Sequence, residues 1–291
     1  MYTIKRAADL TGVPEATLRA WERRYGVISP QRTDGGYRVY DDADLDRVRQ
    51  MRDLIAQGWA PRQAAERVAE SGPVGGDAPE LAEFIAAAAA RDAGAIDGVL
   101  QRAEDAMTFE VFVQDWLMPA VVELGVAWSR GEVSVGGEHL AAHLVMRRLT
   151  RVFDAEGRHS AGQRVLVGLP PGAHHELGLF AFATLARRRG LDVIYGGADL
   201  PTADWVGLAR TGVSGAVLSV PMAADVTAAQ ETVKALRAAL PDLVVAVGGG
   251  YQDGVEAATH LGQPIITAVD RLVQALGHET NREAAQGGPG R

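Results

Sequence analysis

The loop 169–178 contains the residues with the clearest potential for metal chemistry. In this loop His175 is followed three positions later by Gly178. A neutral imidazole can coordinate a metal ion, and a glycine lets a bulky group approach the backbone. The 291-residue chain has no cysteine, so a bound metal depends on histidine or carboxylate, and His175 is the best-placed ligand. The alternative interpretation is that His175 is simply exposed or caps the following helix.

Small residues stand where two later strands are expected to end. Ser219 comes at the end of one apolar run, and Gly248 with Gly249 at the end of the next. In open parallel sheets ligands bind beyond the carboxyl ends of the strands, where the loop of His175 also belongs. We expect these residues to leave room for a large flat ligand. The chain has no Walker-type or G-x-G-x-x-G motif, which disfavours a nucleotide.

A tryptophan and a Glu-His pair form a third group, upstream of the loop. Trp128 is followed after nine residues by Glu138 and His139, with Val135 in between. A flat ring offers a large apolar face, and a carboxylate accepts hydrogen bonds from hydroxyl groups. The alternative is a buried tryptophan, with Glu138 at a helix start, where the helix dipole favours an acidic residue. Taken alone, the spacing fits either interpretation.

The first 40 residues have the pattern of a helix-turn-helix. We expect a short helix over 4–10 that stops at Gly12, and a second helix that begins at Pro14 and ends at Gly26. A short helix, a tight turn and an arginine-bearing helix form the usual arrangement for entering the major groove of DNA.

The second helix has two distinct faces. Leu18, Trp21 and Tyr25 share one of them, which predicts Trp21 as a core residue, and Arg19 and Arg23 share an outward face.

The segment that follows suits a hairpin whose turn is Asp34-Gly35-Gly36. Arg38 and the tyrosines at 37 and 40 are then placed to donate hydrogen bonds to phosphates.

These residues resemble the winged-helix head of MerR-family transcription regulators. The family pattern is present as Thr17-Leu18-Arg19 and as Gly36-Tyr37-Arg38-Val39-Tyr40. The resemblance covers residues 1–70 and implies double-stranded operator DNA as a partner. It also implies a set of DNA contacts, namely Arg19, Tyr25, Tyr37 and Arg38. The alternative is that these are surface charges solvating a small helical domain.

Three predicted domains position these groups, and they make the chain a multidomain protein. They are a winged helix-turn-helix over 1–70, a four-helix bundle over 80–155 and an α/β flavodoxin- or Rossmann-like layer over 163–278, followed by a disordered tail over 279–291. The linker 71–79 is rich in Gly and Pro. Buried-face spacing predicts the bundle core, at Phe109, Phe112, Trp116, Ala120 and Leu124. Short β-branched runs alternating with helices predict five parallel strands, at 164–169, 192–197, 215–220, 243–249 and 264–269.

The α/β segment with His-x-x-Gly, Ser219 and Gly248-Gly249 resembles the cobalamin-binding domain. The resemblance implies that His175 is the lower axial ligand of cobalt. The stretch from Trp128 to His139 resembles the helical cap of light-sensing repressors of the CarH and LitR type. There the cap covers the upper face of adenosylcobalamin, which implies contacts from Trp128, Val135, Glu138 and His139.

By the same resemblance, the chain is a light-responsive repressor and not an enzyme. The family's dark, cofactor-bound form is a homotetramer on operator DNA, which becomes smaller and releases DNA when light cleaves the cobalt–carbon bond. Two alternatives remain open, namely a cobalamin-independent MerR-type regulator and a corrinoid enzyme or methyl-carrier module.

Two positions depart from the family pattern. Ala173 stands where an acidic residue usually orients the ligand histidine. Ser129 stands where a histidine that ligates cobalt after photolysis can follow the tryptophan. Either His139 or His143 takes that role here, or the photoproduct keeps water.

The net charge of −8 does not exclude DNA binding, because the charges are unevenly divided. Residues 1–40 have 7 Lys and Arg against 4 Asp and Glu, whereas residues 71–291 have 17 against 26. The first ten residues lack the apolar core of a signal peptide, and no apolar run approaches about 20 residues. We therefore expect a cytoplasmic, nucleoid-associated protein that does not bind membranes.

Overall fold

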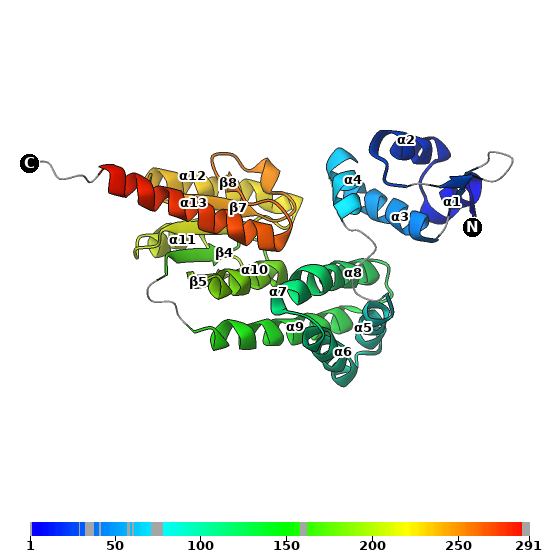
Figure 1. The fold of residues 1–291 in the computed structure, drawn as a ribbon, viewed down its shortest axis with the longest axis horizontal. Coiled ribbons are helices and arrows are strands. Elements are labelled where there is room, and N and C mark those ends of the chain that lie inside the picture. The colour runs from blue at the N-terminus through cyan, green and yellow to red at the C-terminus, as the bar shows by residue number, and fades with distance from the viewer. Residues whose placement is uncertain are drawn as a thin grey trace, which may run out of the picture. The chain divides into compact units, whose positions relative to one another are not determined.

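The computed structural model describes residues 2–28, 30–32, 38–40, 42–56, 59, 61–70, 78–157 and 162–286. The chain divides into two compact units, Met1–Gly75 and Gly76–Arg291. Each unit has its own hydrophobic core. The helices and strands of each unit are shown in Figure 1.

The N-terminal unit is a small helical domain with a three-stranded antiparallel sheet in the order β1-β3-β2. Its elements are β1 (Tyr2–Thr3), α1 (Ile4–Thr11), α2 (Glu15–Tyr25), β2 (Gln31–Arg32), β3 (Arg38–Tyr40), α3 (Asp42–Ala56) and α4 (Pro61–Glu70). Gly12 and Gly26 end α1 and α2 in the left-handed conformation, which glycine adopts without steric cost. The predicted helix-turn-helix is confirmed. The predicted turn at 34–36 lies outside the described residues, although β2 and β3 pair as the two arms of a hairpin.

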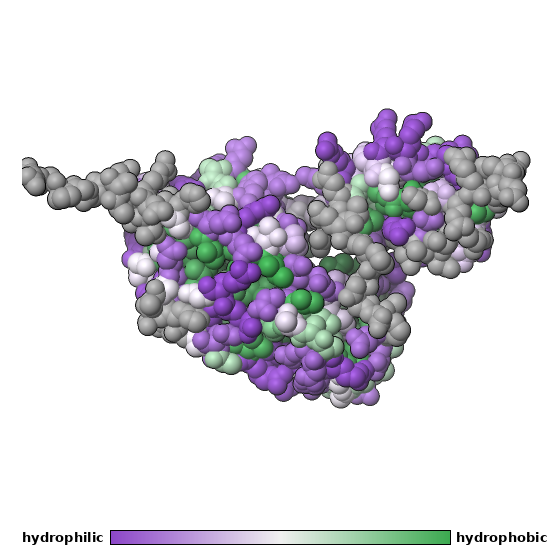
Figure 2. All heavy atoms as spheres, in the orientation of Figure 1, coloured by the Kyte–Doolittle hydropathy of each residue, from purple (hydrophilic) through white to green (hydrophobic). Residues whose placement is uncertain are grey.

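The two faces of α2 are as predicted. Leu18 and Trp21 are buried in the domain core, Tyr25 is half-buried, and Arg19 and Arg23 are exposed. Figure 2 shows hydrophilic side chains gathered over α2 on the visible face of this unit.

The C-terminal unit begins with a bundle of helices. They are α5 (Ala78–Ala90), α6 (Ala93–Asp105), α7 (Phe109–Val111), a π-helical segment (Phe112–Leu117), α8 (Met118–Ser129) and α9 (Val135–Ala155). The predicted core spacing is confirmed at Phe112, Trp116, Ala120 and Leu124, which are buried, whereas Phe109 is half-buried. Trp116 stacks on Phe112 with the ring centroids 5.7 Å apart, so aromatic packing fixes the bundle centre.

One run in the described part of the chain, Phe109–Ser129, has the length and composition to cross a membrane, with a mean hydropathy of 1.3. The expectation that no apolar run approaches about 20 residues is therefore wrong for this segment. Because Trp116, Leu117, Ala120 and Leu124 of this run are buried in the bundle, we interpret it as a core helix.

The rest of the unit is a five-stranded parallel sheet in the order β5-β4-β6-β7-β8. Its elements are β4 (Arg164–Gly168), α10 (Glu176–Arg188), β5 (Asp192–Gly197), α11 (Thr202–Ala209), β6 (Gly215–Ser219), α12 (Val226–Ala239), β7 (Val244–Gly248), β8 (Thr259–His260) and α13 (Ile265–Gln286), with short 3₁₀ turns at Ala223–Asp225 and Gln252–Gly254. The flavodoxin- or Rossmann-like layer is confirmed, with α10 and α13 sharing one core and α11 and α12 the other (Figure 1).

The fifth predicted strand is wrong. The run 264–269 opens α13 after Pro264, and the fifth strand is the short β8. Val269, Leu272 and Leu276 are buried at steps of three and four, as on a helix that packs against a sheet. A short β-branched run fits a buried helix as well as a strand, which explains the error. The same helix continues to Gln286, into the segment expected to be disordered, and residues 287–291 lie outside the described residues.

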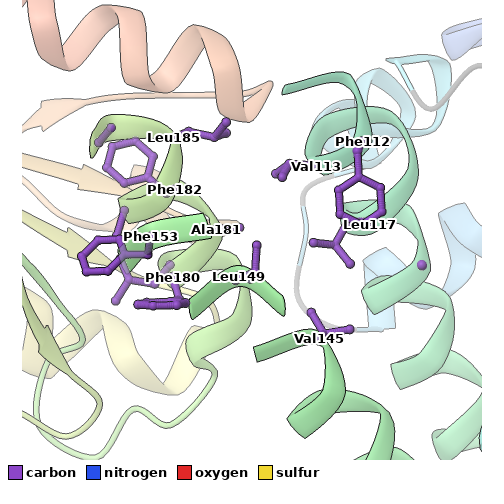
Figure 3. Close-up of a cluster of buried hydrophobic side chains, with 14 of the residues drawn as sticks. Phe112, Val113, Leu117, Val145, Leu149, Phe153, Phe180, Ala181, Phe182 and Leu185 are labelled. Carbon is purple, nitrogen blue, oxygen red and sulfur yellow. The ribbon is translucent and has the colours of Figure 1, made fainter. Parts of the chain in front are cut away.

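The bundle and the sheet, predicted as domains over 80–155 and 163–278, pack on one shared core. Phe153 of α9 packs on Phe180 of α10 with the ring centroids 5.1 Å apart (Figure 3). The guanidinium of Arg187 lies 3.3 Å from the centre of the Phe153 ring and donates to the backbone oxygens of Phe153 and Val193. This buried arginine ties the last turns of α9 to the sheet.

Candidate functional site

The DNA-contact candidates of the N-terminal unit already have partners within it. Arg19 forms an exposed ion pair with Glu15, with nitrogen and oxygen 3.1 Å apart. Arg38 Nε donates to Glu22 Oε2 at 2.6 Å, and this hydrogen bond raises the pKa of Arg38. The bond uses only one of three guanidinium nitrogens, so the other two can donate to phosphates. Tyr37 lies outside the described residues.

Tyr40 does not have the predicted role. Its side chain is fully buried, burial raises the pKa of its hydroxyl, and no partner for that hydroxyl occurs among the described residues. A side chain without exposed surface cannot donate to a phosphate, so of the two wing tyrosines only Tyr37 remains a candidate.

The residues expected at the sheet edge do meet there. In this strand order the connection after β4 runs to β5 on one side and the connection after β6 runs to β7 on the other, so the crevice between β4 and β6 is the usual ligand position in a doubly wound sheet. Ser219 ends β6 opposite Gly248 at the end of β7, and Gly168 ends β4 opposite Leu218. The loop of His175 leaves β4 at the same edge.

His175 is exposed and immediately precedes α10. Its side chain makes no capping hydrogen bond to that helix, which removes one of the alternative interpretations. The loop itself is held from the turn after β5: Gly172 N donates to Asp199 Oδ1 at 2.7 Å, and Asp199 N donates to Ala173 O at 3.0 Å. The histidine is thus presented on a fixed loop with its ring open to a ligand.

Two residues that sequence reasoning missed shape this edge. Asp199 has a φ of +50°, which an aspartate tolerates better than most residues, and it fastens the loop. Glu176 Oε1 accepts from Ala198 N at 3.0 Å and so joins α10 to the turn after β5. A signal was present in the sequence, because both acidic residues follow strand ends, but no spacing rule distinguishes them from surface carboxylates.

The glycines of the site differ in what surrounds them. A side chain at Gly248 would meet nothing within 4 Å, so this position leaves open space. A side chain at Gly178 would meet only Met118 Sδ of α8, at 4.0 Å. Gly249 has a φ of +91° and lies against Val220 O, so local backbone packing requires it. The start of α10 at Gly178 therefore faces Met118, the first residue of α8.

The residues around the α8–α9 junction are unusually exposed for their types. Trp128 is 50% exposed and Val135 is 56% exposed, which contradicts the interpretation of Trp128 as a buried core residue. Val135 is the first residue of α9, Ser134 caps this helix, and Glu138 lies in its first turn, as the helix-start interpretation expects. Glu138 Oε2 accepts from His139 Nδ1 at 2.6 Å.

Ser129 cannot serve as a strong metal ligand. Its hydroxyl donates to Val126 O at 2.7 Å. Position 129 therefore offers no imidazole that could ligate a metal.

The donor set favours a metal that arrives inside an organic ligand. Within the described ranges no group of three or more His, Asp or Glu residues could hold a metal ion. One histidine can complete the coordination of a metal whose other ligands come with it. Gly248 leaves space, and Trp128 and Val135 leave apolar surface, so these residues fit a large metal-containing macrocycle. Tyr195, near the end of β5, adds a hydroxyl buried without a partner among the residues described, with its pKa raised by that burial.

Comparisons with known proteins define the class. Residues 2–70 match the family described as MerR HTH family regulatory protein, and residues 80–152 match the B12 binding domain. The fold of the C-terminal unit is that of the Methanosarcina barkeri monomethylamine corrinoid protein, with a TM-score of 0.54 at 13% identity, covering 66% of this chain and 95% of that one. The class is a MerR-type regulator with a B12-binding domain.

Two curated relatives narrow the class to a family. The HTH-type transcriptional repressor CarA of Myxococcus xanthus is 35% identical in an alignment that covers 93% of this chain and 94% of the relative. The HTH-type transcriptional repressor CarH of the same organism is 33% identical, over 85% of this chain and 88% of the relative. The chain belongs to this family of MerR-type transcriptional repressors. Both relatives are repressors, which agrees with the prediction of a regulator rather than an enzyme.

Proposed function

We propose that the protein is a light-responsive repressor that binds adenosylcobalamin between its helical bundle and its sheet. In the dark it binds operator DNA as a homotetramer, in the cytoplasm on the nucleoid, and light releases it as a smaller species. The cobalamin-binding repressor follows from the family, whereas the adenosyl form, the light response and the tetramer are the proposal.

The observation that supports this proposal most strongly is the exposure of Trp128 and Val135. Large apolar side chains that are half-exposed on adjoining helices leave surface that a ligand can bury. Glu138 and His139 lie about one turn further along α9, where the Glu138 carboxylate and the Nε2 of His139 can accept hydrogen bonds from the hydroxyls of an upper ligand. The hydrogen bond from His139 Nδ1 to Glu138 Oε2, at 2.6 Å, fixes the direction of the Glu138 carboxylate.

The sheet edge supplies the lower side. His175 would ligate cobalt, and Gly178, Ser219, Gly248 and Gly249 would face the macrocycle and its tail. Asp199 fixes the loop by accepting from Gly172 N with its side chain and donating to Ala173 O with its backbone N, which keeps the imidazole at one position. When bound, the cofactor supplies a cobalt–carbon bond that light can cleave.

The proposed response to light depends on which elements the bound upper ligand contacts. A group that contacts α8, α9 and the sheet edge favours one relation of the bundle to the sheet, and its loss biases the unit toward another. Several heads on one assembly bind DNA with an affinity raised by effective concentration. Disassembly alone can therefore release DNA, even though each head is only weakly basic.

The test of cofactor binding is a titration of the purified protein with adenosylcobalamin in darkness, followed by absorption spectrum and equilibrium dialysis. Trp128→Ala should weaken binding, whereas Val122→Ala, at a 58% exposed valine on the same helix, should not. His175→Ala should change the cobalt spectrum, and His174→Ala, at the neighbouring exposed histidine, should leave it as in the wild type. No binding, or equal effects of each variant and its control, would contradict the proposed site.

A cobalamin-independent regulator is the second candidate, and Ala173 favours it. The residue is buried and carries no carboxylate for His175, so a bond from that histidine to a metal lacks its usual orienting group. If the protein binds operator DNA equally well with and without the cofactor, and in light and dark, this second candidate holds.

A further inference from the structure

Two histidines on consecutive turns of α9 are held in the same way. His139 Nδ1 lies 2.6 Å from Glu138 Oε2, and His143 Nδ1 lies 2.7 Å from the backbone oxygen of His139. Carboxylate and carbonyl oxygens only accept hydrogen bonds, so in both rings Nδ1 is the donor. In each neutral ring the lone pair is therefore on Nε2, the nitrogen that faces away from these oxygens.

This arrangement is typical of metal-ligating histidines. Such residues almost always donate their second ring nitrogen to a carboxylate or a backbone carbonyl, which fixes the tautomer and the orientation of the ring. His139 has the carboxylate and His143 has the carbonyl. Both side chains are exposed, that of His139 to 66%, so both Nε2 atoms are accessible to an ion from solution.

The spacing brings the two rings together. Residues four apart lie on one face of a helix with their Cβ atoms about 5–6 Å apart, and two histidines at this spacing bind zinc in the H-E-x-x-H motif. We propose that His139 and His143 form a two-imidazole site for a divalent transition-metal ion of the Cu²⁺, Ni²⁺ and Zn²⁺ class, with water in the remaining positions.

The site is bidentate, which sets its properties. No cluster of three or more candidate ligands occurs in the described ranges, so the affinity comes from the two rings alone. Imidazole suits copper, nickel and zinc, whereas magnesium and calcium prefer oxygen ligands. Affinity should follow Cu²⁺ above Ni²⁺ and Zn²⁺, and it should fall on acidification because protons compete for the same lone pairs. This site goes beyond the proposed function, since it requires neither cobalamin nor DNA.

His260 provides a matched comparison elsewhere on the chain. Its Nε2 lies 2.7 Å from Val255 O, and its Nδ1 lies 3.6 Å from Asp253 Oδ1. Because Nε2 donates to Val255 O, only Nδ1 of this neutral ring has a lone pair, and no second histidine stands four residues away to complete a two-imidazole site. His260→Gln should therefore leave metal binding unchanged.

The experiment is a titration of the full-length, cobalamin-free protein with Cu²⁺ above neutral pH, read by calorimetry and by the nitrogen hyperfine pattern in electron paramagnetic resonance. Wild type and His260→Gln should show a site with two nitrogen ligands. His139→Gln and His143→Gln should each weaken this site at least about tenfold, the lower end of what even outer-shell changes cost.

A second readout uses thermal unfolding. Zn²⁺ should raise the Tm of the wild type and of His260→Gln, because an ion that binds only the folded state stabilises it. The shift should vanish in His143→Gln, whose metal-free Tm serves as the check on folding. If either His139→Gln or His143→Gln keeps the wild-type affinity and the two-nitrogen signal, the proposal is wrong.

Discussion

At the scale of single residues, Arg38 is held in place by Glu22. The bond from Arg38 Nε to Glu22 Oε2 fixes the stem of a side chain that is 30% exposed, while its outer nitrogens can still reach a phosphate. A preorganised guanidinium loses less side-chain entropy on binding than a free one. Contacts of this kind set affinity and salt dependence but read no base sequence.

Arg38→Ala should weaken binding to specific and random DNA by the same factor. The slope of log K against log salt concentration should fall in magnitude by about 1, the share of one phosphate contact. Fluorescence anisotropy over a salt series measures both. Glu22→Gln, which keeps the arginine charge, serves as the control and should leave the slope unchanged. An unaltered slope in Arg38→Ala would assign this residue to the domain's own structure.

Residue periodicity predicts the faces of α2 correctly, because Leu18, Trp21 and Arg19 follow one helical repeat. It does not predict the burial of Tyr40, since β3 has three residues and offers no alternation to read. Nor does it predict the exposure of Trp128, because a tryptophan at helical spacing is usually buried. An exception such as the exposed Trp128 is expected at a binding site, where function can override the usual burial of an apolar residue.

At the scale of elements, the crossing of α5 and α9 depends on Gly137. A Cβ at this position would lie 2.3 Å from the backbone oxygen of Ala88, which cannot move aside like a flexible side chain. The preceding residue, Gly136, has nothing within 4 Å of the same position. Two adjacent glycines on one helix thus have opposite packing requirements.

Gly137→Ala should destabilise the bundle by about 1–3 kcal/mol, as overpacking does, whereas Gly136→Ala should stabilise it by up to about 1 kcal/mol through helix propensity. Urea unfolding monitored by circular dichroism gives both values. Equal effects of the two substitutions would show that α5 and α9 do not approach so closely.

An ion cluster joins the bundle to α10. Arg188 Nε donates to Glu110 Oε1 at 2.8 Å, and Arg188 also pairs with Glu156 at the end of α9. Burial opposes ionisation of Glu110, but the hydrogen bond and charge of Arg188, with a backbone hydrogen bond, outweigh it and lower the pKa of this carboxyl.

A lowered pKa in the folded state means that the ionised carboxylate adds stability above its unfolded value, about 4.3, and that this stability is lost as the pH falls through the folded value. The Tm difference between wild type and Glu110→Gln should therefore be positive near pH 7 and shrink toward zero on acidification below about pH 4. Differential scanning calorimetry over this range measures it. A difference that stays constant down to the lowest pH would exclude the ion pair as its source.

The helices and strands were predictable where the length of a segment and the spacing of its apolar residues indicated the same structure. The first four strands alternate with helices long enough to cross over, so their parallel order followed. The fifth strand was not predictable. The run 264–269 is too short for its periodicity to distinguish a strand from a buried helix, and the actual strand, β8, has only two residues. The shared core of α9 and α10 was not predictable either, because Arg187 and Phe153 are far apart in the sequence and come into contact only in the folded chain.

At the scale of the whole molecule, the two units have different tasks. Residues 2–70 of the N-terminal unit match the MerR HTH family, and the C-terminal unit has the bundle and sheet that would hold the ligand. In our account the ligand acts on assembly, and assembly acts on DNA affinity. A change in the size of the cofactor-bound protein on illumination is therefore the central requirement of the proposed switch.

The most direct test is size-exclusion chromatography with light scattering on the protein mixed with adenosylcobalamin in darkness, repeated after green light. We predict a tetramer in the dark and a smaller species after illumination, with the cofactor-free protein unaffected by light. One constant mass in all four conditions would contradict the account.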